Sequence, residues 1–251
     1  MPETVLRTEG LKKFFGGLAA VAGVSLACER ERIHAVIGPN GAGKTTLINL
    51  LSGDLAPSAG RIEILGRDVT GLPSHRIARL GVGRSYQRTN IFLRFTVLEN
   101  CRLAAQAALP SSMRFVRPAG TYREVNEAAA RAIARAELCG REHVPAHALS
   151  HGERRQLELA MTLATEPTLL LLDEPLAGMG AEESARMVEL LRKLRARHAI
   201  LLVEHDMDAV FALADTLTVM VNGAVLASGT PAQMRASPEV QQAYLGSDAH
   251  G

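Results

Sequence analysis

The stretch Gly38-Pro39-Asn40-Gly41-Ala42-Gly43-Lys44-Thr45-Thr46 decides the fold of this 251-residue chain. It fits the pattern G-x-x-x-x-G-K-[ST] of a phosphate-binding loop. Residues 33–37 before it predict a buried strand, and residues 45–51 after it predict a helix. A glycine-rich turn between a strand and a helix can point several backbone N–H groups at one anion. The alternative is a strand–helix turn that binds nothing.

The polar residues of this loop have distinct expected roles. Lys44 would reach the β- and γ-phosphates of a nucleotide, and the Thr45 hydroxyl would hold Mg²⁺. Thr46 would donate to a nearer phosphate. The motif therefore predicts a nucleotide and Mg²⁺ as ligands.

Composition excludes several classes of protein. Apolar residues make up 47% of the chain, as in a globular protein with a real core, and the net charge is only +2. So small a charge does not suggest nucleic acid as a partner. The three cysteines lie far apart, without zinc or disulfide spacing, which fits a reducing compartment. No apolar run approaches the ~18 residues of a membrane-spanning helix, so any membrane role would be peripheral.

The pattern of elements predicts one domain over residues 1–251, made of an α/β core and an insertion. Strands dominate residues 5–37, and residues 61–65 alternate like a half-buried strand. Ala-rich helical patterns over residues 97–108 and 122–138 interrupt them. We therefore assign residues 1–87 and 149–251 to an α/β core that includes a β subdomain, and residues 88–148 to an inserted α-helical subdomain.

Candidate catalytic residues follow two later strands. Four leucines run into Asp173-Glu174, and residues 199–203 lead to His205. Ligands of open α/β sheets bind beyond the carboxyl ends of the strands, so these side chains can meet the phosphate loop at one nucleotide. Asp173 would hold Mg²⁺, Glu174 would act as general base toward water, and His205 would contact the γ-phosphate. The alternatives are a helix cap or salt bridge for the acidic pair and an ordinary strand-end histidine.

Short polar motifs mark other element boundaries. Ser150-x-x-Glu153 is a capping box that opens a helix through Leu163. Asn222-Gly223 between two apolar runs predicts a two-residue hairpin. Thr230-Pro231 and Ser237-Pro238 predict the starts of two short helices.

Taken together, these motifs resemble the ATPase subunits of ABC transporters over nearly the whole chain. The resemblance implies an α/β P-loop NTPase fold with an antiparallel β subdomain and an inserted α-helical subdomain, and ATP as the nucleotide. Gly38–Thr45 resembles the Walker A motif, and Leu169–Asp173 with Glu174 resembles Walker B and its catalytic glutamate. Gln87 is similar to the Q-loop glutamine, which touches Mg²⁺ and senses the membrane partner, and His205 to the switch histidine. The signature motif is represented by Leu149, Ser150, His151, Gly152 and Glu153.

Phe15 resembles the aromatic residue that stacks on adenine in this family. It precedes Lys44 by 44 − 15 = 29 positions, a spacing typical of the family. Two alternatives stay open: Phe15 packs within its strand, or the neighbouring Phe14 takes the stacking role.

The resemblance implies a head-to-tail pair of ATPase subunits, in which the signature of one chain meets the ATP on the phosphate loop of the other. Three departures bear on that pairing. His151 stands where the family usually has Gly, Glu153 where it has Gln, and Gly180 where many members have Asp. His151 could alter the pH response, and Gly180 puts communication between the two sites in doubt.

Finer features resemble the ATPase of branched-chain amino acid importers. These are the helical segment between Gln87 and Ser150, Gly16-Gly17, and the tail over residues 238–246. The implied partners are integral membrane permeases, a second ATPase subunit, the same or related, and indirectly an external solute-binding protein. The implied location is the cytoplasmic face of the inner membrane.

Three alternatives remain for the function. The lipopolysaccharide-export ATPase is the alternative within transporters, although its helical segment is shorter. A soluble ABC ATPase acting on DNA or ribosomes would usually carry coiled-coil arms, tandem cassettes or zinc cysteines. A P-loop kinase would make a phosphorylated acceptor, whereas a transporter ATPase releases free phosphate.

Overall fold

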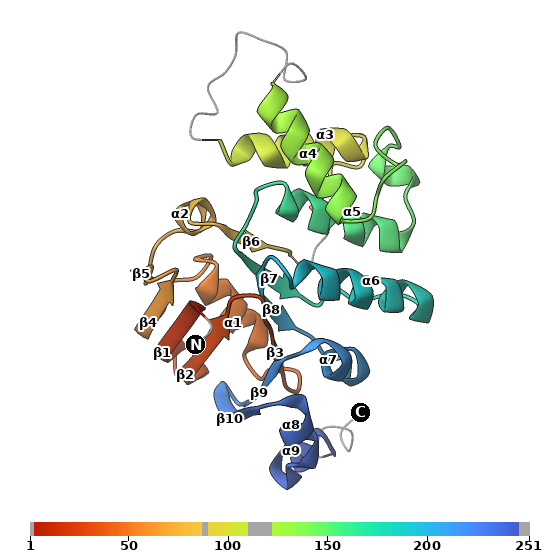
Figure 1. Ribbon diagram of the computed structural model, residues 1–251. Coiled ribbons are helices and arrows are strands. Elements are labelled where there is room, and N and C mark those ends of the chain that lie inside the picture. The colour runs from red at the N-terminus through yellow and green to blue at the C-terminus, as the bar shows by residue number, and fades with distance from the viewer. Residues whose placement is uncertain (1–2, 87–89, 110–121, 246–251) are drawn as a thin grey trace.

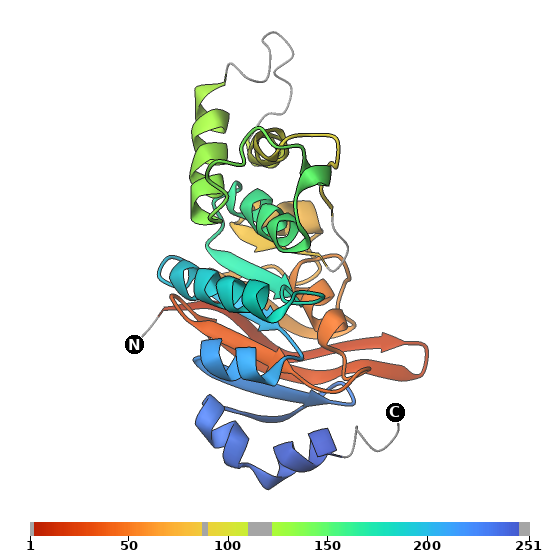
Figure 2. The ribbon, with the colours of Figure 1, turned by 90° about the vertical axis from the view of Figure 1, so that its right-hand side faces the viewer.

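The computed structural model describes residues 3–86, 90–109 and 122–245. Within these residues, two sheets and the helices around them form the layers seen in Figures 1 and 2. Gln87 lies outside the described residues, so its predicted role stays a prediction.

The first sheet is antiparallel, in agreement with the antiparallel β subdomain expected for this chain. A turn at Gly16-Gly17 folds β1 onto β2, so that Phe15 lies opposite Leu18. In the described residues the strand order is β2-β1-β4-β5. The strands are β1 (Thr4–Phe15), β2 (Leu18–Glu29), β4 (Ala59–Ile64) and β5 (Arg67–Asp68).

The second sheet carries the predicted catalytic strands. Its order in the described residues is β10-β9-β3-β8-β7-β6, with all neighbours parallel except the edge pair β9 and β10. Asn222 and Gly223 both have positive φ at the turn between β9 and β10, which confirms the predicted hairpin. The strands are β3 (Ile33–Ile37), β6 (Val82–Arg84), β7 (Leu169–Asp173), β8 (Ala199–Val203), β9 (Thr216–Val221) and β10 (Ala224–Gly229).

The apolar core lies on both faces of this second sheet, because successive side chains of a strand point to opposite faces. On one face Leu170 and Leu172 join an apolar cluster with helices α3 to α7. On the other face Leu169 and Leu171 join a cluster with β1, β2, β4 and α1. This double burial explains why β7 is a continuous run of leucines, all of them buried.

The predicted helix starts at Ser150, Thr230-Pro231 and Ser237-Pro238 are confirmed. The cap residues Ser150 and Thr230 form capping boxes with Glu153 and Gln233. The helices are α1 (Lys44–Leu51), α2 (Ser74–Arg79), α3 (Val97–Ala107), α4 (Arg123–Arg135), α5 (His151–Leu163), α6 (Ala181–Leu194), α7 (Met207–Leu213), α8 (Pro231–Ala236) and α9 (Pro238–Leu245).

A helical layer of α3, α4 and α5 lies at the top of the molecule in Figure 1. The sequence assigned α5 to the core, but α5 packs against both α3 and α4. The reason is that one apolar cluster contains Cys101 of α3, Ile133 of α4 and Leu157 of α5. The same cluster continues to β7 and α6, so α5 connects the helical layer with the sheet.

Candidate functional site

The phosphate loop connects β3 to α1 and leaves the start of that helix open. Gly43 is the N-cap residue of α1, with φ of 97°, and no described side chain caps this end. A Cβ at Gly43 would come within 2.2 Å of the backbone oxygen of Ala20, so only glycine fits between the loop and β2. The free N–H groups of the first turn therefore face an anion site without competition from a side chain.

Lys44 points back over this loop. Its Nζ donates to the backbone oxygens of Gly38 at 2.6 Å and Pro39 at 3.0 Å. Burial lowers the pKa of Lys44, and the charges of Glu174 and Asp173 partly oppose this shift. The ammonium group therefore lies in the field of the carboxylates at the end of β7. Thr45 is exposed and Thr46 half-buried.

Asp173 ends β7 as a buried carboxyl group, 1% exposed. Neither of its side-chain oxygens has a hydrogen-bond partner among the described residues. Burial, and next the charge of Glu174, raise the pKa of Asp173 to about 6. A buried carboxylate without donors is costly unless a cation pairs with it, so this donor fits the hard oxygen-ligated Mg²⁺.

Glu174 follows with an unusual backbone, since its φ is 50°. Its backbone N–H donates to the oxygen of Val203 on β8 at 2.9 Å. His205 lies beyond the end of β8, and its Nδ1 is 3.8 Å from Oε1 of Glu174. The structure thus brings Lys44, Asp173, Glu174 and His205 to one edge of the sheet, as the strand pattern predicted.

Glu204 is the residue that sequence reasoning left without a role. It is fully buried, and burial raises the pKa of its carboxyl group. Its oxygens accept hydrogen bonds from the backbone N–H of Leu176 at 2.9 Å and of His205 at 3.1 Å. The available signal was an acidic residue directly after a strand of five apolar residues.

The signature residues lie at the start of α5, in the helical layer above the sheet (Figure 1). The hydroxyl of Ser150 accepts from the N–H of Glu153 at 3.2 Å, and Glu153 accepts from the N–H of Ser150 at 2.8 Å. Glu183 of α6 accepts from the N–H of Gly152 at 3.2 Å. Two first-turn N–H groups of α5 are therefore already bonded to side chains of the same chain.

The departures His151 and Glu153 both have contacts in the structure. His151 Nε2 lies 3.3 Å from the backbone oxygen of Ala177, in the loop that follows Glu174. Glu153 forms an ion pair with Arg141 at 2.8 Å. Signature residues of this chain also line a cavity of about 390 Å³. Its lining comprises Glu137, Arg141, Ser150, Gly152, Glu153, Gln156, Met179, Glu183, Arg186 and Met187, with no residue of the phosphate loop.

Phe15 lies at the tip of the hairpin of β1 and β2 and is 49% exposed. Lys13 Nζ sits 5.3 Å from the centre of its ring. Phe14 is also exposed, so neither aromatic ring is buried by packing within the sheet. Because β2 touches the phosphate loop at Ala20, this hairpin lies beside the nucleotide site.

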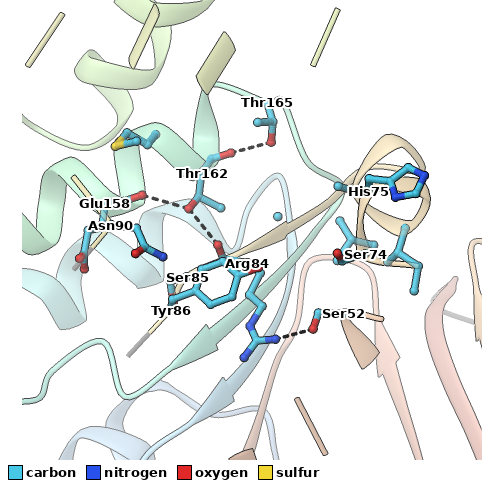
Figure 3. Close-up of a pocket in the computed structure, with 15 residues that line it drawn as sticks. Ser52, Ser74, His75, Arg84, Ser85, Tyr86, Asn90, Glu158, Thr162 and Thr165 are labelled. Atoms are coloured by element: carbon cyan, nitrogen blue, oxygen red, sulfur yellow. Dashed lines mark hydrogen bonds between the residues drawn. The ribbon is translucent and has the colours of Figure 1, made fainter. Parts of the chain in front are cut away.

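A second cavity, of about 380 Å³, lies between α2, β6 and α5 (Figure 3). Arg84 lies beside it, donates to Ser52 and Asn49, each at 2.5 Å, and also bonds to Asp54. The guanidinium group of Arg84 stacks over Tyr86, 4.5 Å from the ring centre. Arg84 therefore connects the end of α1 to this cavity.

Comparisons with known proteins decide the family. The family model described as ABC transporter matches residues 21–177, more than half of the chain. The chain belongs to the ABC transporter family. It is a P-loop ATPase that binds and hydrolyses ATP. A second family model, for branched-chain amino acid ATP-binding cassette transporters, matches residues 224–250.

Relatives of this ABC ATPase align with it over nearly its full length. It is 41% identical to the high-affinity branched-chain amino acid transport ATP-binding protein BraF of Pseudomonas aeruginosa, over 98% of this chain and 99% of that protein. It is 40% identical to LivG, the protein of the same description from Escherichia coli, with the same coverage.

Solved structures agree with the fold. A nucleotide-free ATP-binding cassette from an ABC transporter superposes with a TM-score of 0.86 at 29% identity, covering 96% of this chain and 98% of that one. The dimeric structure of another cassette, bound to ADP and Pi, superposes with a TM-score of 0.76 at 21% identity. It covers 90% of this chain and 98% of the other.

Proposed function

We propose that this ABC ATPase powers the import of branched-chain amino acids or related amino-acid, urea or amide solutes. The observation that carries this proposal is the match of residues 224–250 to the branched-chain amino acid transporter model. This segment includes β10, α8 and α9. The names of BraF and LivG favour the same class of solute over lipopolysaccharide export.

The residues at the edge of the sheet have separate roles in ATP hydrolysis. Lys44 and the N–H groups at the start of α1 bind and orient the β- and γ-phosphates. Glu174 takes a proton from the attacking water, and His205 contacts the γ-phosphate as its charge develops. Phe15 stacks on the adenine, with Phe14 as the alternative.

Mg²⁺ fits the same site. Thr45 and Asp173 would hold it, together with Gln87, and the ion would neutralise charge on the phosphates. The buried oxygens of Asp173, which have no partner among the described residues, support this assignment.

The working unit is a pair of ATPase subunits. Leu149 to Glu153 of one subunit would cover the ATP that the phosphate loop of the other holds. ATP would then close the pair, and hydrolysis would release it. The second subunit is the same chain or a related one, and we favour a related one.

Permeases are the proposed membrane partners. In the part of the chain that the structure describes, no helix is both long and apolar enough to cross a bilayer. We place the permease contact at the helical segment over residues 88–148 and at the cavity beside Arg84 (Figure 3). The chain would then lie peripherally on the cytoplasmic face, and an external solute-binding protein would deliver the solute.

Purification of the chain from its host membrane tests this proposal. We expect permeases and an ATPase partner to copurify. In proteoliposomes, ATP hydrolysis to free phosphate should rise when a solute-binding protein loaded with leucine is added. Hydrolysis that leucine, other amino acids, urea and amides all leave unchanged would contradict the import proposal, and a phosphorylated product would indicate a kinase instead.

A further inference from the structure

The loops after β7 and β8 carry Glu174 and His205, and Glu204 joins them. Its carboxylate bonds to the N–H of Leu176 in the first loop and to the N–H of His205 in the second. Leu176 is two residues from Glu174. One buried side chain therefore fixes the two loops that hold the proposed base and the proposed γ-phosphate contact.

The backbone of Glu174 needs such a support. A non-glycine residue with φ near 50° adopts a strained backbone conformation, which persists where its surroundings hold it. Two hydrogen bonds hold this turn from β8: the N–H of Glu174 donates to Val203, and the N–H of Leu176 donates to Glu204. Only the second depends on a side chain.

Glu204 also acts on the ring of His205. Nδ1 lies 3.7 Å from Oε2 of Glu204 and 3.8 Å from Oε1 of Glu174. Both carboxylates lie on the Nδ1 side of the ring and so constrain its orientation. Nε2 is then the ring nitrogen that remains toward the γ-phosphate, to which it would donate as an N–H group.

We propose that Glu204 is a positioning residue for ATP hydrolysis, which holds Glu174 and His205 in their relative places. The proposal rests on the proposed roles of Glu174 and His205. A buried carboxylate is costly to desolvate, and an apolar residue could fill the same space. Its two hydrogen bonds to functional loops give the physical reason for placing an acid there.

The test is the variant Glu204→Gln, which keeps the shape of the side chain. The amide offers one acceptor oxygen where the carboxylate offers two, so its NH₂ group must face one of the two N–H donors. We expect kcat for ATP hydrolysis to fall about 10- to 100-fold, because misplacement by about 1 Å is enough for such a loss. The Kd for ATP should stay within about twofold, because no phosphate-binding group changes.

The matched control is Glu189→Gln, on α6. Glu189 is exposed and pairs with Arg192 at 2.7 Å, so this variant removes a carboxylate without touching either loop. It should keep the kcat of the native chain. Glu204→Asp, which keeps the charge but shortens the reach, should lose less activity than Glu204→Ala.

A spectroscopic readout separates positioning from loss of folded protein. The ¹⁵N signals of the His205 ring, identified by their absence in His205→Ala, should change in Glu204→Gln and stay in place in Glu189→Gln. Unchanged His205 signals, or a kcat within twofold of the native value, would overturn the proposal. Should Glu204→Gln unfold, the same signals and kcat in Glu204→Asp decide the matter.

Failure of the proposed function would look different. If Glu174→Gln keeps normal turnover, Glu174 is not the base and the roles on which the proposal rests are wrong. If Glu174→Gln is inactive while Glu204→Gln hydrolyses ATP normally, only the role of Glu204 is wrong.

Discussion

Two helix N-termini of this chain are proposed to bind the same kind of phosphate, and they are built differently. Gly43 is the N-cap of α1, whose first turn holds no acidic residue, and no side chain among the described residues caps this helix start. The start of α5 has a capping box from Ser150 and Glu153, and Glu183 occupies a further N–H group. The phosphate loop is thus open to an anion in the single subunit. At the start of α5, by contrast, the N–H groups of Gly152 and Glu153 are already bonded to the side chains of Glu183 and Ser150.

This difference bears on how two subunits would close. An anion at α1 gains N–H donors to which no side chain in the described part of the chain is bonded. An anion at α5 must displace Glu183 or accept its negative charge nearby, and either event reduces the gain from binding. We therefore expect the phosphate loop to bind ATP in one subunit and the signature to add affinity only on closure.

The variant with the largest expected effect tests whether the start of α1 in one subunit and the start of α5 in the other meet at one ATP. Glu174→Gln should lower kcat about 100- to 10,000-fold by removing the general base, while ATP still binds. Size measurement by light scattering with ATP and Mg²⁺ should then show a dimer. A variant that hydrolyses ATP at the native rate would refute the role of Glu174. A monomer with ATP bound would indicate that this chain needs a different partner.

Lys44→Ala should weaken ATP binding about 10- to 100-fold, because a charge-assisted contact of about 1.5–3 kcal/mol is lost. Titration with a fluorescent ATP analogue measures this change. Ser150→Ala is the control at the other helix, and it should leave the affinity of the single subunit unchanged. Equal losses in both variants would remove the distinction between the two helix ends.

Glu183→Gln should strengthen the ATP-dependent dimer about fivefold, because it removes about 1 kcal/mol of competing charge from the start of α5. The dimerisation constant is best measured with Glu174→Gln present, so that ATP persists. Glu182→Gln, an exposed neighbour in the same turn, is the control. Weaker dimerisation in Glu183→Gln would mean that Glu183 supports the signature instead of competing for it.

Asp173 gives the smallest effect, a shift in stability with pH. The pKa of Asp173 in the folded chain, about 6, lies above its ordinary value of 3.8. This group therefore stabilises the fold fully below pH 3.8 and loses that contribution as pH rises through 6. Asp173→Asn should therefore raise the Tm of the nucleotide-free protein more at pH 8 than at pH 5, because the penalty on the charged carboxylate grows from about pH 3.8 to above pH 6. Each 1 kcal/mol corresponds to about 2–4 °C. A Tm gain that is equal at both pH values would contradict this origin.

Much of the fold could be predicted because its signals are local. The phosphate loop, the leucine run of β7 and the Asn222-Gly223 turn each depend on residues adjacent in the chain. The sequence also placed Asp173, Glu174 and His205 at strand ends, and parallel strands bring such ends together. Capping at Ser150 needed only a partner three residues away.

The tertiary structure alone decided the contacts between distant segments. Glu183 reaches Gly152 across 31 positions, and Glu204 reaches Leu176 across 28. No periodicity encodes these pairs, because they depend on how β7 lies beside β8 and how α6 packs near α5. The sequence by itself determined which groups can bind a nucleotide, and packing decided which of them are free to do so and which are already bonded within the chain.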